Sequence, residues 1–305
     1  MIPETKIKCP LCGKNDFHLY QKNINLLQCE SCGIVVDKHI IHDVANEELV
    51  KAWFVEDYNQ SRSFWVEMFE SWANKRTWNR IARFASQKRT KLFEIGVGSG
   101  SFLKFVKDKG FDVAGCDLSK SICKHVENTY NITMHYGFIS DLPLPFQFDV
   151  IVTNHVLEHV NDPLKFLSDL KARLKEDGII HIAVPNVAAW EARFSGWTSY
   201  EPYHLIYFSP RTLRRLVETA GFRVVTLSTH ESFSGWFLSI LRTLLKTNKK
   251  SADLRKSQKK SRSKSWIEHV YSAVMILSGG ILFPLRYVQS KLDYGDEIVV
   301  IAKKG

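Results

Sequence analysis

The sequence predicts an α/β fold in which a parallel sheet is covered by helices on both faces. Three observations support this. An apolar run at 91–95 leads directly into a glycine-rich turn and then an amphipathic helix at 101–109. Strand-like and helix-like segments then alternate along the chain. Finally, 45% of the 305 residues are hydrophobic, which is typical of a globular protein. The expected strands are 91–95, 111–116, 132–136, 148–152, 178–184, 222–229 and 297–302.

The glycine turn carries Gly96, Gly98 and Gly100, and it is the point around which the predicted fold is organised. Glycine permits positive φ and leaves no Cβ in the way, so main-chain N–H groups can face a bound molecule. A dinucleotide fingerprint would need glycine where this chain has Ser101. A P-loop would need a following Gly-Lys-Ser/Thr, which is absent. The pattern therefore disfavours a pyrophosphate cradle.

Polar residues follow the next strands in order. Asp117 ends the second strand, 23 residues after Glu94, where folds of this class place an acid on ribose hydroxyls. The fourth strand runs into the string Asn-His-Val-Leu-Glu-His-Val-Asn-Asp-Pro at 154–163. The alternatives are an ordinary strand-to-helix turn at the glycines and a helix cap at Asp117.

The set Glu-x-Gly-x-Gly-x-Gly at 94–100 resembles motif I of the class I S-adenosylmethionine (SAM) methyltransferases, and 154–163 resembles the post-strand motif of their ubiquinone-biosynthesis type. The resemblance covers 58–230 plus the last strand. It implies a Rossmann-like sheet of seven strands, with SAM as the methyl donor. The chain departs from the family at 137–139, where Gly-Phe-Ile lacks the acid often found near adenine. The implied cofactor-binding residues are Glu94, Gly96, Gly98, Gly100, Asp117, Leu118, Phe138, Ile139 and Asn154.

Four cysteines near the N-terminus form two C-x-x-C-G turns separated by sixteen residues. Such knuckles bring four thiolates into the tetrahedral arrangement that structural Zn²⁺ prefers. Segments 17–20 and 26–28 read as short strands, so the module resembles a zinc ribbon. The expected ligands are Cys9, Cys12, Cys29 and Cys32. A disulfide pair or a redox motif is the alternative, and Cys116 and Cys123 are expected to be structural.

The net charge of +10 is concentrated in one segment. Ten basic residues and only Asp253 lie between Arg242 and Lys264, which gives +9 there and leaves +1 for the rest of the chain. Nucleic acid is therefore an unexpected partner. The apolar stretch 273–285 would cover only about 20 Å as a helix, too short to span about 30 Å of hydrocarbon. We expect 242–288 to lie on an anionic membrane surface, or alternatively to form a core-packed helical hairpin with a solvated basic loop.

The expected organisation is a zinc ribbon at 1–40, a helical linker or cap at 41–88, a SAM-binding core at 89–230, a basic and apolar helical insertion at 231–292 and the last strand of the core at 293–305. The linker is expected from Val36 to Asn46, and a long helix over Ser61–Ser86. Tyr58 and Arg62 could reach the SAM carboxylate. With no signal peptide at the start, the expected location is the cytoplasm, with possible peripheral attachment to the inner face of the membrane.

Two histidines are candidates for catalysis. His204 lies in Pro202–Pro210, which resembles the segment of small-molecule methyltransferases where a histidine faces the acceptor, and it is the candidate general base. It lies within an aromatic loop, 185–208, expected to cover the crevice. His155 is spaced i, i+3 and i+4 with Glu158 and His159 on a helical turn, which suits a base, a metal ligand or simple capping.

The resemblance implies a SAM-dependent methyltransferase that acts on a small-molecule acceptor, namely a sugar, a quinone-like compound or a lipid-linked metabolite. Methyl transfer would be an in-line displacement, with the protein positioning the nucleophile. A zinc ribbon before such a domain also resembles the sugar C-methyltransferases of deoxysugar pathways. One alternative is an RNA methyltransferase that grips its substrate with the ribbon, and another is a non-catalytic SAM-binding protein at a membrane surface.

Overall fold

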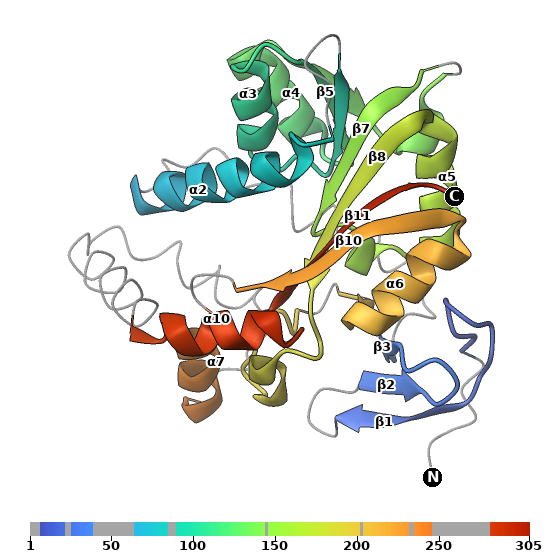
Figure 1. The fold of residues 1–305 in the computed structure, drawn as a ribbon, viewed down its shortest axis with the longest axis vertical. Coiled ribbons are helices and arrows are strands. Elements are labelled where there is room, and N and C mark those ends of the chain that lie inside the picture. The colour runs from blue at the N-terminus through green and yellow to red at the C-terminus, as the bar shows by residue number, and fades with distance from the viewer. Residues whose placement is uncertain are drawn as a thin grey trace. The chain divides into compact units, whose positions relative to one another are not determined.

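The structure is a computed structural model that describes residues 7–21, 26–38, 64–84, 90–143, 146–201, 204–231, 235–245 and 281–305 (Figure 1). The chain forms two compact units, and each unit is assembled from separate stretches of sequence. The cysteine unit comprises Met1–Ile41, Val184–Leu213 and Leu227–Val299. The glycine unit comprises His42–Ala183, Arg214–Thr226 and Val300–Gly305.

A mostly parallel sheet has, among the described residues, seven strands in the order β10-β11-β8-β7-β4-β5-β6. Strand β4 pairs in parallel with β5 and β7, β5 with β6, and β7 with β8. Strand β11 inserts between β10 and β8 and runs opposite to β10 (Figure 1). These findings confirm the predicted α/β fold. The bounds are β4 Lys91–Ile95, β5 Asp112–Asp117, β6 Thr133–Tyr136, β7 Phe148–Asn154, β8 Leu174–Pro185, β10 Phe222–His230 and β11 Glu297–Lys304.

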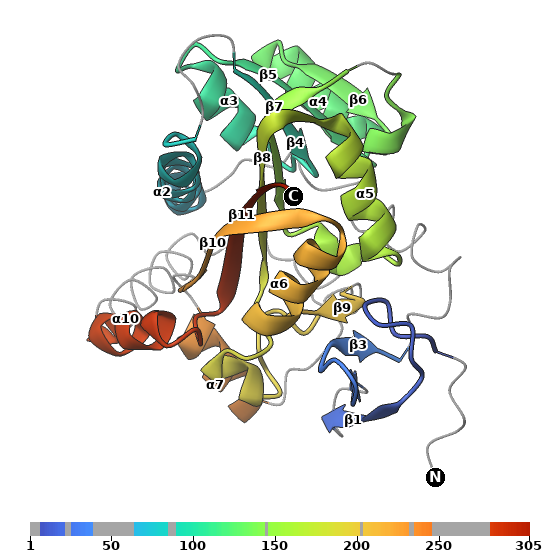
Figure 2. The ribbon, with the colours of Figure 1, turned by 45° about the vertical axis from the view of Figure 1, so that its right-hand side comes forward.

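Helices cover the sheet because its central strands are apolar on both faces. In Figure 2, α2 and α3 lie on one side of the sheet and α5 on the other. Leu103, Val126 and Val152 are fully buried in one core cluster with residues of α2 and β11. The helix bounds are α2 Phe64–Ile81, α3 Ser101–Lys107, α4 Lys120–Tyr130, α5 Pro163–Arg173 and α6 Pro210–Thr219, with short 3-10 turns η1 Ile139–Asp141, η2 Leu157–His159 and η3 Trp190–Arg193.

Helix α2 is shorter than the predicted helix, and only part of its apolar stripe is buried. Trp78 and Ile81, in the last turn, are buried in the core cluster of the glycine unit, whereas Met68 and Trp72 are exposed. The apolar spacing therefore predicted the helix, but it did not predict that apolar side chains in its first half are exposed. Tyr58, Arg62 and the ends of the predicted helix at 61–63 and 85–86 lie outside the described residues.

The cysteine unit contains a second, antiparallel sheet, in which the described strands follow the order β1-β2-β3-β9. Strands β1 and β2 confirm the two short strands predicted between the cysteine pairs. The prediction of a linker from Val36 is wrong at its start, because Val36 and Asp37 belong to β3, and Val36 pairs with Ile206 of β9. The backbone N–H of Asp37 donates to the carbonyl of Leu205 at 2.8 Å. The bounds are β1 Phe17–Gln21, β2 Leu26–Cys29, β3 Val35–Asp37 and β9 Ile206–Tyr207.

The cysteine-bearing strands also share a core with the segment that follows β8. Leu26 and Val35 pack in one buried cluster with Trp197 and Tyr207. The side chain of Gln21 donates to the carbonyl of Ala192 at 3.2 Å. The described residues of 7–37 and of 187–207 thus form one folded body inside the cysteine unit, held by strand pairing, apolar burial and side-chain hydrogen bonds.

The predicted helical insertion at 231–292 contains two described helices, α7 (Gly235–Leu244) and α10 (Phe283–Lys291). Its remaining stretches, 232–234 and 246–280, lie outside the described residues, and so does most of the predicted basic and apolar run. Of the helices that the structure describes, none has the length and apolar character needed to cross a membrane.

Glu191 and Gln289 form a buried polar contact that ties η3 to α10. Both residues are fully buried. The amide of Gln289 donates to Glu191 Oε2 and to the carbonyl of Tyr294, both at 2.6 Å, and its Oε1 accepts from Trp236 Nε1 at 2.8 Å. Burial, followed by the negative charge of Asp296, raises the pKa of Glu191 from 4.5 to about 7. The folded state therefore holds this carboxyl in its neutral form over a wider pH range than the unfolded chain does.

This raised pKa predicts a loss of stability with rising pH. The free energy of unfolding should fall as pH rises from about 4.5 to about 7 by up to about 3 kcal/mol, because only the folded state must ionise a buried group. Glu191→Gln keeps an oxygen acceptor for Gln289 and should remove this pH-dependent fall in stability. The melting temperature of the variant minus that of the wild type should therefore be larger at pH 8 than at pH 5.

Glu176→Gln is the matched control, since Lys304 lowers the pKa of Glu176 from 4.5 through a 2.7 Å hydrogen bond. The stability linked to this lowered pKa is gained below about pH 5, so the melting-temperature difference of the control should be nearly the same at pH 5 and pH 8. A melting-temperature difference for Glu191→Gln that does not change with pH would contradict the assignment.

Candidate functional site

The turn between β4 and α3 brings bare backbone close to its neighbours. Gly96, Gly98 and Gly100 all have positive φ, at 69°, 53° and 71°. A Cβ on Gly96 would lie 2.5 Å from Val156 Cγ2, and one on Gly100 would lie 2.6 Å from Val126 Cγ2. The N-terminus of α3 has no side-chain cap from Gly100, and the N–H of Ser101 donates instead to Ser99 Oγ at 3.3 Å. The glycines are therefore required both by conformation and by space.

Two buried carboxyl groups, Glu94 at the end of β4 and Asp117 at the end of β5, lie beside this turn. They are 5% and 8% exposed. Burial, then the charge of Asp117, raises the pKa of Glu94 well above its usual value. Burial also raises the pKa of Asp117, while backbone N–H groups of Ser119 and Gly98 partly offset that rise. The N–H of Ser119 donates to Asp117 Oδ1 at 2.8 Å.

The arrangement assigns opposite roles to the two acids. Asp117 accepts backbone hydrogen bonds, which favour its ionised form, whereas burial and the neighbouring charge of Asp117 favour the neutral form of Glu94. Among the described residues Glu94 Oε2 has no hydrogen-bond partner. A buried oxygen without a partner is costly, so a ligand with hydroxyl or ammonium donors fits this edge of the sheet.

The remaining predicted cofactor residues lie at the carboxyl ends of neighbouring strands. Leu118 follows β5 and is half-buried. Beyond β6, Phe138 is exposed, whereas Ile139 is buried at the start of η1. Asn154 ends β7, and its Oδ1 finds no partner in the described part of the chain. Because β4, β5, β6 and β7 are parallel, these residues share the edge that carries the glycine turn.

Helix α2 supplies contacts to the glycine turn that sequence reasoning missed. Asn74 Nδ2 donates to Ser101 Oγ at 3.1 Å, and Ser99 Oγ donates to Glu70 Oε2 at 3.5 Å. The helical spacing marked only the apolar residues of α2, whereas the residues of α2 that contact the glycine turn are polar. No local motif marks them, since the contact depends on how α2 packs.

His155 does not lie in the helical turn that its spacing predicted. It has φ of 54°, so it precedes the 3-10 turn η2, which begins at Leu157. Its Nδ1 lies 3.4 Å from Oε1 of Glu158, and the Glu158 side chain is almost fully buried whereas the His155 side chain is half exposed. The left-handed backbone therefore replaces the expected helical stacking, and an ion pair joins the two side chains.

His204 belongs to the cysteine unit, directly before β9. It is only 7% exposed, and its Nδ1 lies 2.8 Å from the carbonyl of Ser199. A carbonyl can only accept, so Nδ1 carries the proton and, in the neutral ring, Nε2 is the basic nitrogen. The ring also meets that of Tyr207 edge-on at 6.0 Å between centroids. The loop therefore fixes both the orientation and the tautomer of this histidine.

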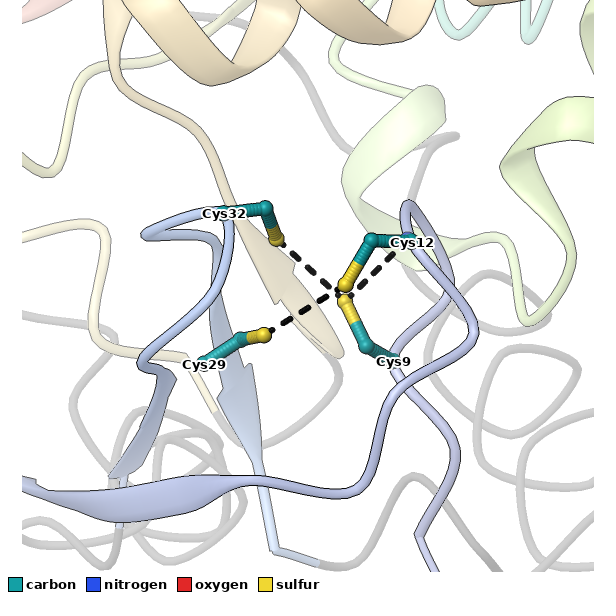
Figure 3. A group of neighbouring side chains, drawn as sticks. All are labelled: Cys9, Cys12, Cys29 and Cys32. Carbon is teal, nitrogen blue, oxygen red and sulfur yellow. Dashed lines mark hydrogen bonds between the residues drawn. The ribbon is translucent and has the colours of Figure 1, made fainter.

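The four cysteines of the two C-x-x-C turns converge in the cysteine unit (Figure 3). Cys9 Sγ lies 3.4 Å from Cys32 Sγ, and Cys12 Sγ lies 3.6 Å from Cys29 Sγ. All four are free cysteines, which excludes the disulfide alternative in this structure. Bonds of about 2.3 Å to a tetrahedral zinc ion would place the sulfurs about 3.8 Å apart, close to these separations. The group is therefore compatible with zinc.

Asp16 lies beside the cysteine group and was not predicted. One carboxylate oxygen accepts from Cys29 Sγ at 3.4 Å and the other accepts a short hydrogen bond from the hydroxyl of Ser31. Burial raises the pKa of Cys29 to about 12, so a cation is needed to hold this thiol as a thiolate at neutral pH. Asp16 adds negative charge beside the group, which favours a bound cation.

Comparison with known proteins places this site in a family. A family model described as a methyltransferase domain matches residues 64–227, more than half of the chain. A probable S-adenosylmethionine-dependent methyltransferase of Mycolicibacterium smegmatis is 30% identical over 135 residues, which are 44% of this chain and 52% of that protein. The ubiquinone biosynthesis O-methyltransferase of Haemophilus ducreyi is 31% identical over 107 residues, 32% of this chain and 45% of that protein.

The chain spans about half the length of these curated relatives. Among solved structures, a putative sarcosine dimethylglycine methyltransferase from Galdieria sulphuraria is similar with a TM-score of 0.50 at 17% identity, covering 76% of this chain and 84% of that one. This structural likeness concerns the fold alone. From the match over 64–227, the chain belongs to the methyltransferase-domain family.

Proposed function

We propose that this methyltransferase modifies a small-molecule acceptor and uses His204 as its general base. The observation that carries the proposal is the fixed tautomer of His204, whose Nδ1 is held 2.8 Å from the carbonyl of Ser199. A nearly buried imidazole with a defined basic nitrogen suits the removal of one proton from an acceptor hydroxyl or carbon acid. His155, which is paired with Glu158, is the second candidate to orient the acceptor.

The SAM contacts that we propose follow the geometry of the glycine unit. Asp117 accepts from the ribose hydroxyls, since it is the ionised acid at the end of β5. The turn at 96–100 holds the methionine part, and neutral Glu94 lies next to it. Phe138 and Ile139 flank adenine, while Leu118 and Asn154 complete the edge.

When bound, SAM supplies an electrophilic methyl group on a sulfonium. Methyl transfer would be an in-line displacement at this methyl carbon with the sulfur as leaving group, and His204 Nε2 would take up the proton that the acceptor loses. The residues of this chain orient the acceptor, exclude water and take up that proton.

Two observations favour a small acceptor over RNA. The charge outside 242–264 sums to only +1, so the rest of the chain lacks the excess of cations that a polynucleotide groove requires. In addition, one relative is named for O-methylation in ubiquinone biosynthesis. A quinone-like, sugar or lipid-linked metabolite is the acceptor class that fits.

We also propose that the four cysteines hold one structural Zn²⁺. Their sulfurs lie within 4.8 Å of one another. Four protein ligands leave no open position for a substrate or a reactive water, so the ion would stabilise the fold and take no part in the chemistry.

Substituting Asp117 should weaken SAM binding. The loss of a charge-assisted hydrogen bond costs about 1.5 to 3 kcal/mol, so Asp117→Ala should bind SAM about 10- to 150-fold more weakly by calorimetry. Asp112→Ala, an exposed carboxylate at the opposite end of β5, is the matched control and should bind normally. Equal affinities in the two variants would refute the ribose assignment.

Substituting His204 should separate chemistry from cofactor binding. In an assay with methyl-labelled SAM and cell extract, we expect label in soluble metabolites or lipids, and His204→Ala should reduce its rate of incorporation about 10²- to 10⁴-fold. SAM affinity should be unchanged, because the base acts on the acceptor. His125→Ala on α4 is the control for loss of an imidazole.

An unaltered rate in His204→Ala would show that the histidine only supports its loop. Label that enters RNA and disappears after ribonuclease treatment would overturn the small-molecule assignment.

Elemental analysis should find one zinc ion per chain in freshly purified, reduced protein. Cys29→Ser should lose the metal and melt at a lower temperature, because binding of a structural zinc is coupled to folding. Cys123→Ser removes a free, buried cysteine outside the group and should keep the full metal content. Wild-type protein with less than half an equivalent of zinc would count against a structural zinc site.

A further inference from the structure

Helix α10 has its polar side buried and its apolar side exposed. Arg286 is 6% exposed and Gln289 is fully buried, although both side chains are polar. Phe283, Tyr287 and Val288 are 64%, 55% and 50% exposed. A helix on the surface of a globular protein normally shows the reverse arrangement. The inversion suggests that the outer side of α10 faces an apolar environment.

Specific contacts fix this rotation of α10. Gln289 is held by Glu191, the carbonyl of Tyr294 and Trp236. Arg286 Nε lies 3.4 Å from Glu231 Oε2, and both side chains are about nine-tenths buried. Turning the helix to hide its apolar residues would break these buried polar contacts. The buried polar contacts inside the unit therefore keep the apolar side of α10 exposed.

Helix α7 extends the same surface. It is joined to α10 by the hydrogen bond from Trp236 to Gln289, and the two helices lie side by side in Figures 1 and 2. Ser239 of α7 is buried, whereas Leu244 and Leu245 at its end are exposed. Together with α10, they form what we call the α7/α10 surface, with Leu244, Leu245, Phe283, Tyr287 and Val288 as its main apolar residues.

The charge next to this surface is strongly positive. The chain that leaves α7 carries nine of the ten basic residues counted between Arg242 and Lys264, against one acid. Arg242 lies on α7 itself and Lys291 on α10. The other nine basic residues follow Leu245 in the sequence, whereas Arg242 and Lys291 are carried by the described helices.

We propose that the α7/α10 surface docks this protein on a lipid bilayer containing anionic phospholipids. Exposed aromatic and aliphatic side chains flanked by cations are typical of segments that lie in a membrane interface. Nine residues of α10 span about 14 Å, so the helix lies in the interface and does not cross it. Anionic headgroups neutralise the cations, whereas a second copy of this chain would bring a second set of like charges.

Vesicle sedimentation with the full chain tests this. Binding to phosphatidylcholine vesicles containing phosphatidylserine should exceed binding to phosphatidylcholine alone by about a hundredfold if three cations engage. High salt should reduce that excess. The double variant Phe283→Ser with Val288→Ser should bind about tenfold less or weaker still. Leu19→Ser with Phe146→Ser, which removes exposed apolar side chains elsewhere, is the matched control and should bind like wild type.

Both double variants should keep wild-type SAM affinity, which verifies folding and separates this test from that of the proposed function. Equal binding to the two kinds of vesicle, or undiminished binding by the α10 variant, overturns the proposal. The proposal also fails if the protein binds no vesicles and the α10 variant differs in mass from the wild type by sedimentation equilibrium. The surface would then join two copies of the chain.

Discussion

The close approach of backbone at the β4–α3 turn is the constraint on which the glycine unit depends. A side chain at Gly96 or Gly100 would collide with Val156 or Val126, so no other residue fits without displacing the neighbouring elements. The same turn lies beside two buried carboxyl groups. Backbone hydrogen bonds favour the ionised form of Asp117 and burial favours the neutral form of Glu94, which suits an edge that meets the hydroxyl and ammonium groups of a ligand.

The cysteine unit depends on a different kind of contact, one between segments far apart in the sequence. Strand β9 extends the sheet of the cysteine-bearing strands, and the segment that carries His204 lies directly before β9. A metal held by the cysteines would therefore stabilise the strands on which this segment is built. The ribbon in this chain is part of the scaffold of the candidate catalytic loop, since the two share strand pairing, a buried cluster and side-chain hydrogen bonds.

Sequence reasoning predicted the parts of the fold whose signals are local. The apolar run before Gly96, the acid at Asp117 and the two cysteine knuckles are each marked by a few adjacent residues. The structure places Asp117 beside the glycine turn in one unit and brings the four cysteines together in the other, as expected. The pairing of Val36 with Ile206 could not be predicted, because strands of three and two residues carry no periodic signal and the partners are distant in the chain. The helical spacing at His155 did not reveal its left-handed backbone. The rotation of α10 depends on buried partners from η3, from α7 and from Glu231, which follows β10.

We propose that SAM binds at the edge formed by the glycine turn and the two acids. A crystal structure of the protein with S-adenosylhomocysteine tests it most directly. We expect the ribose hydroxyls within hydrogen-bond distance of Asp117 and the methionine part against the backbone of Gly96 to Gly100. A well-ordered ligand bound elsewhere, or ribose hydroxyls that make no contact with Asp117, would contradict the claim.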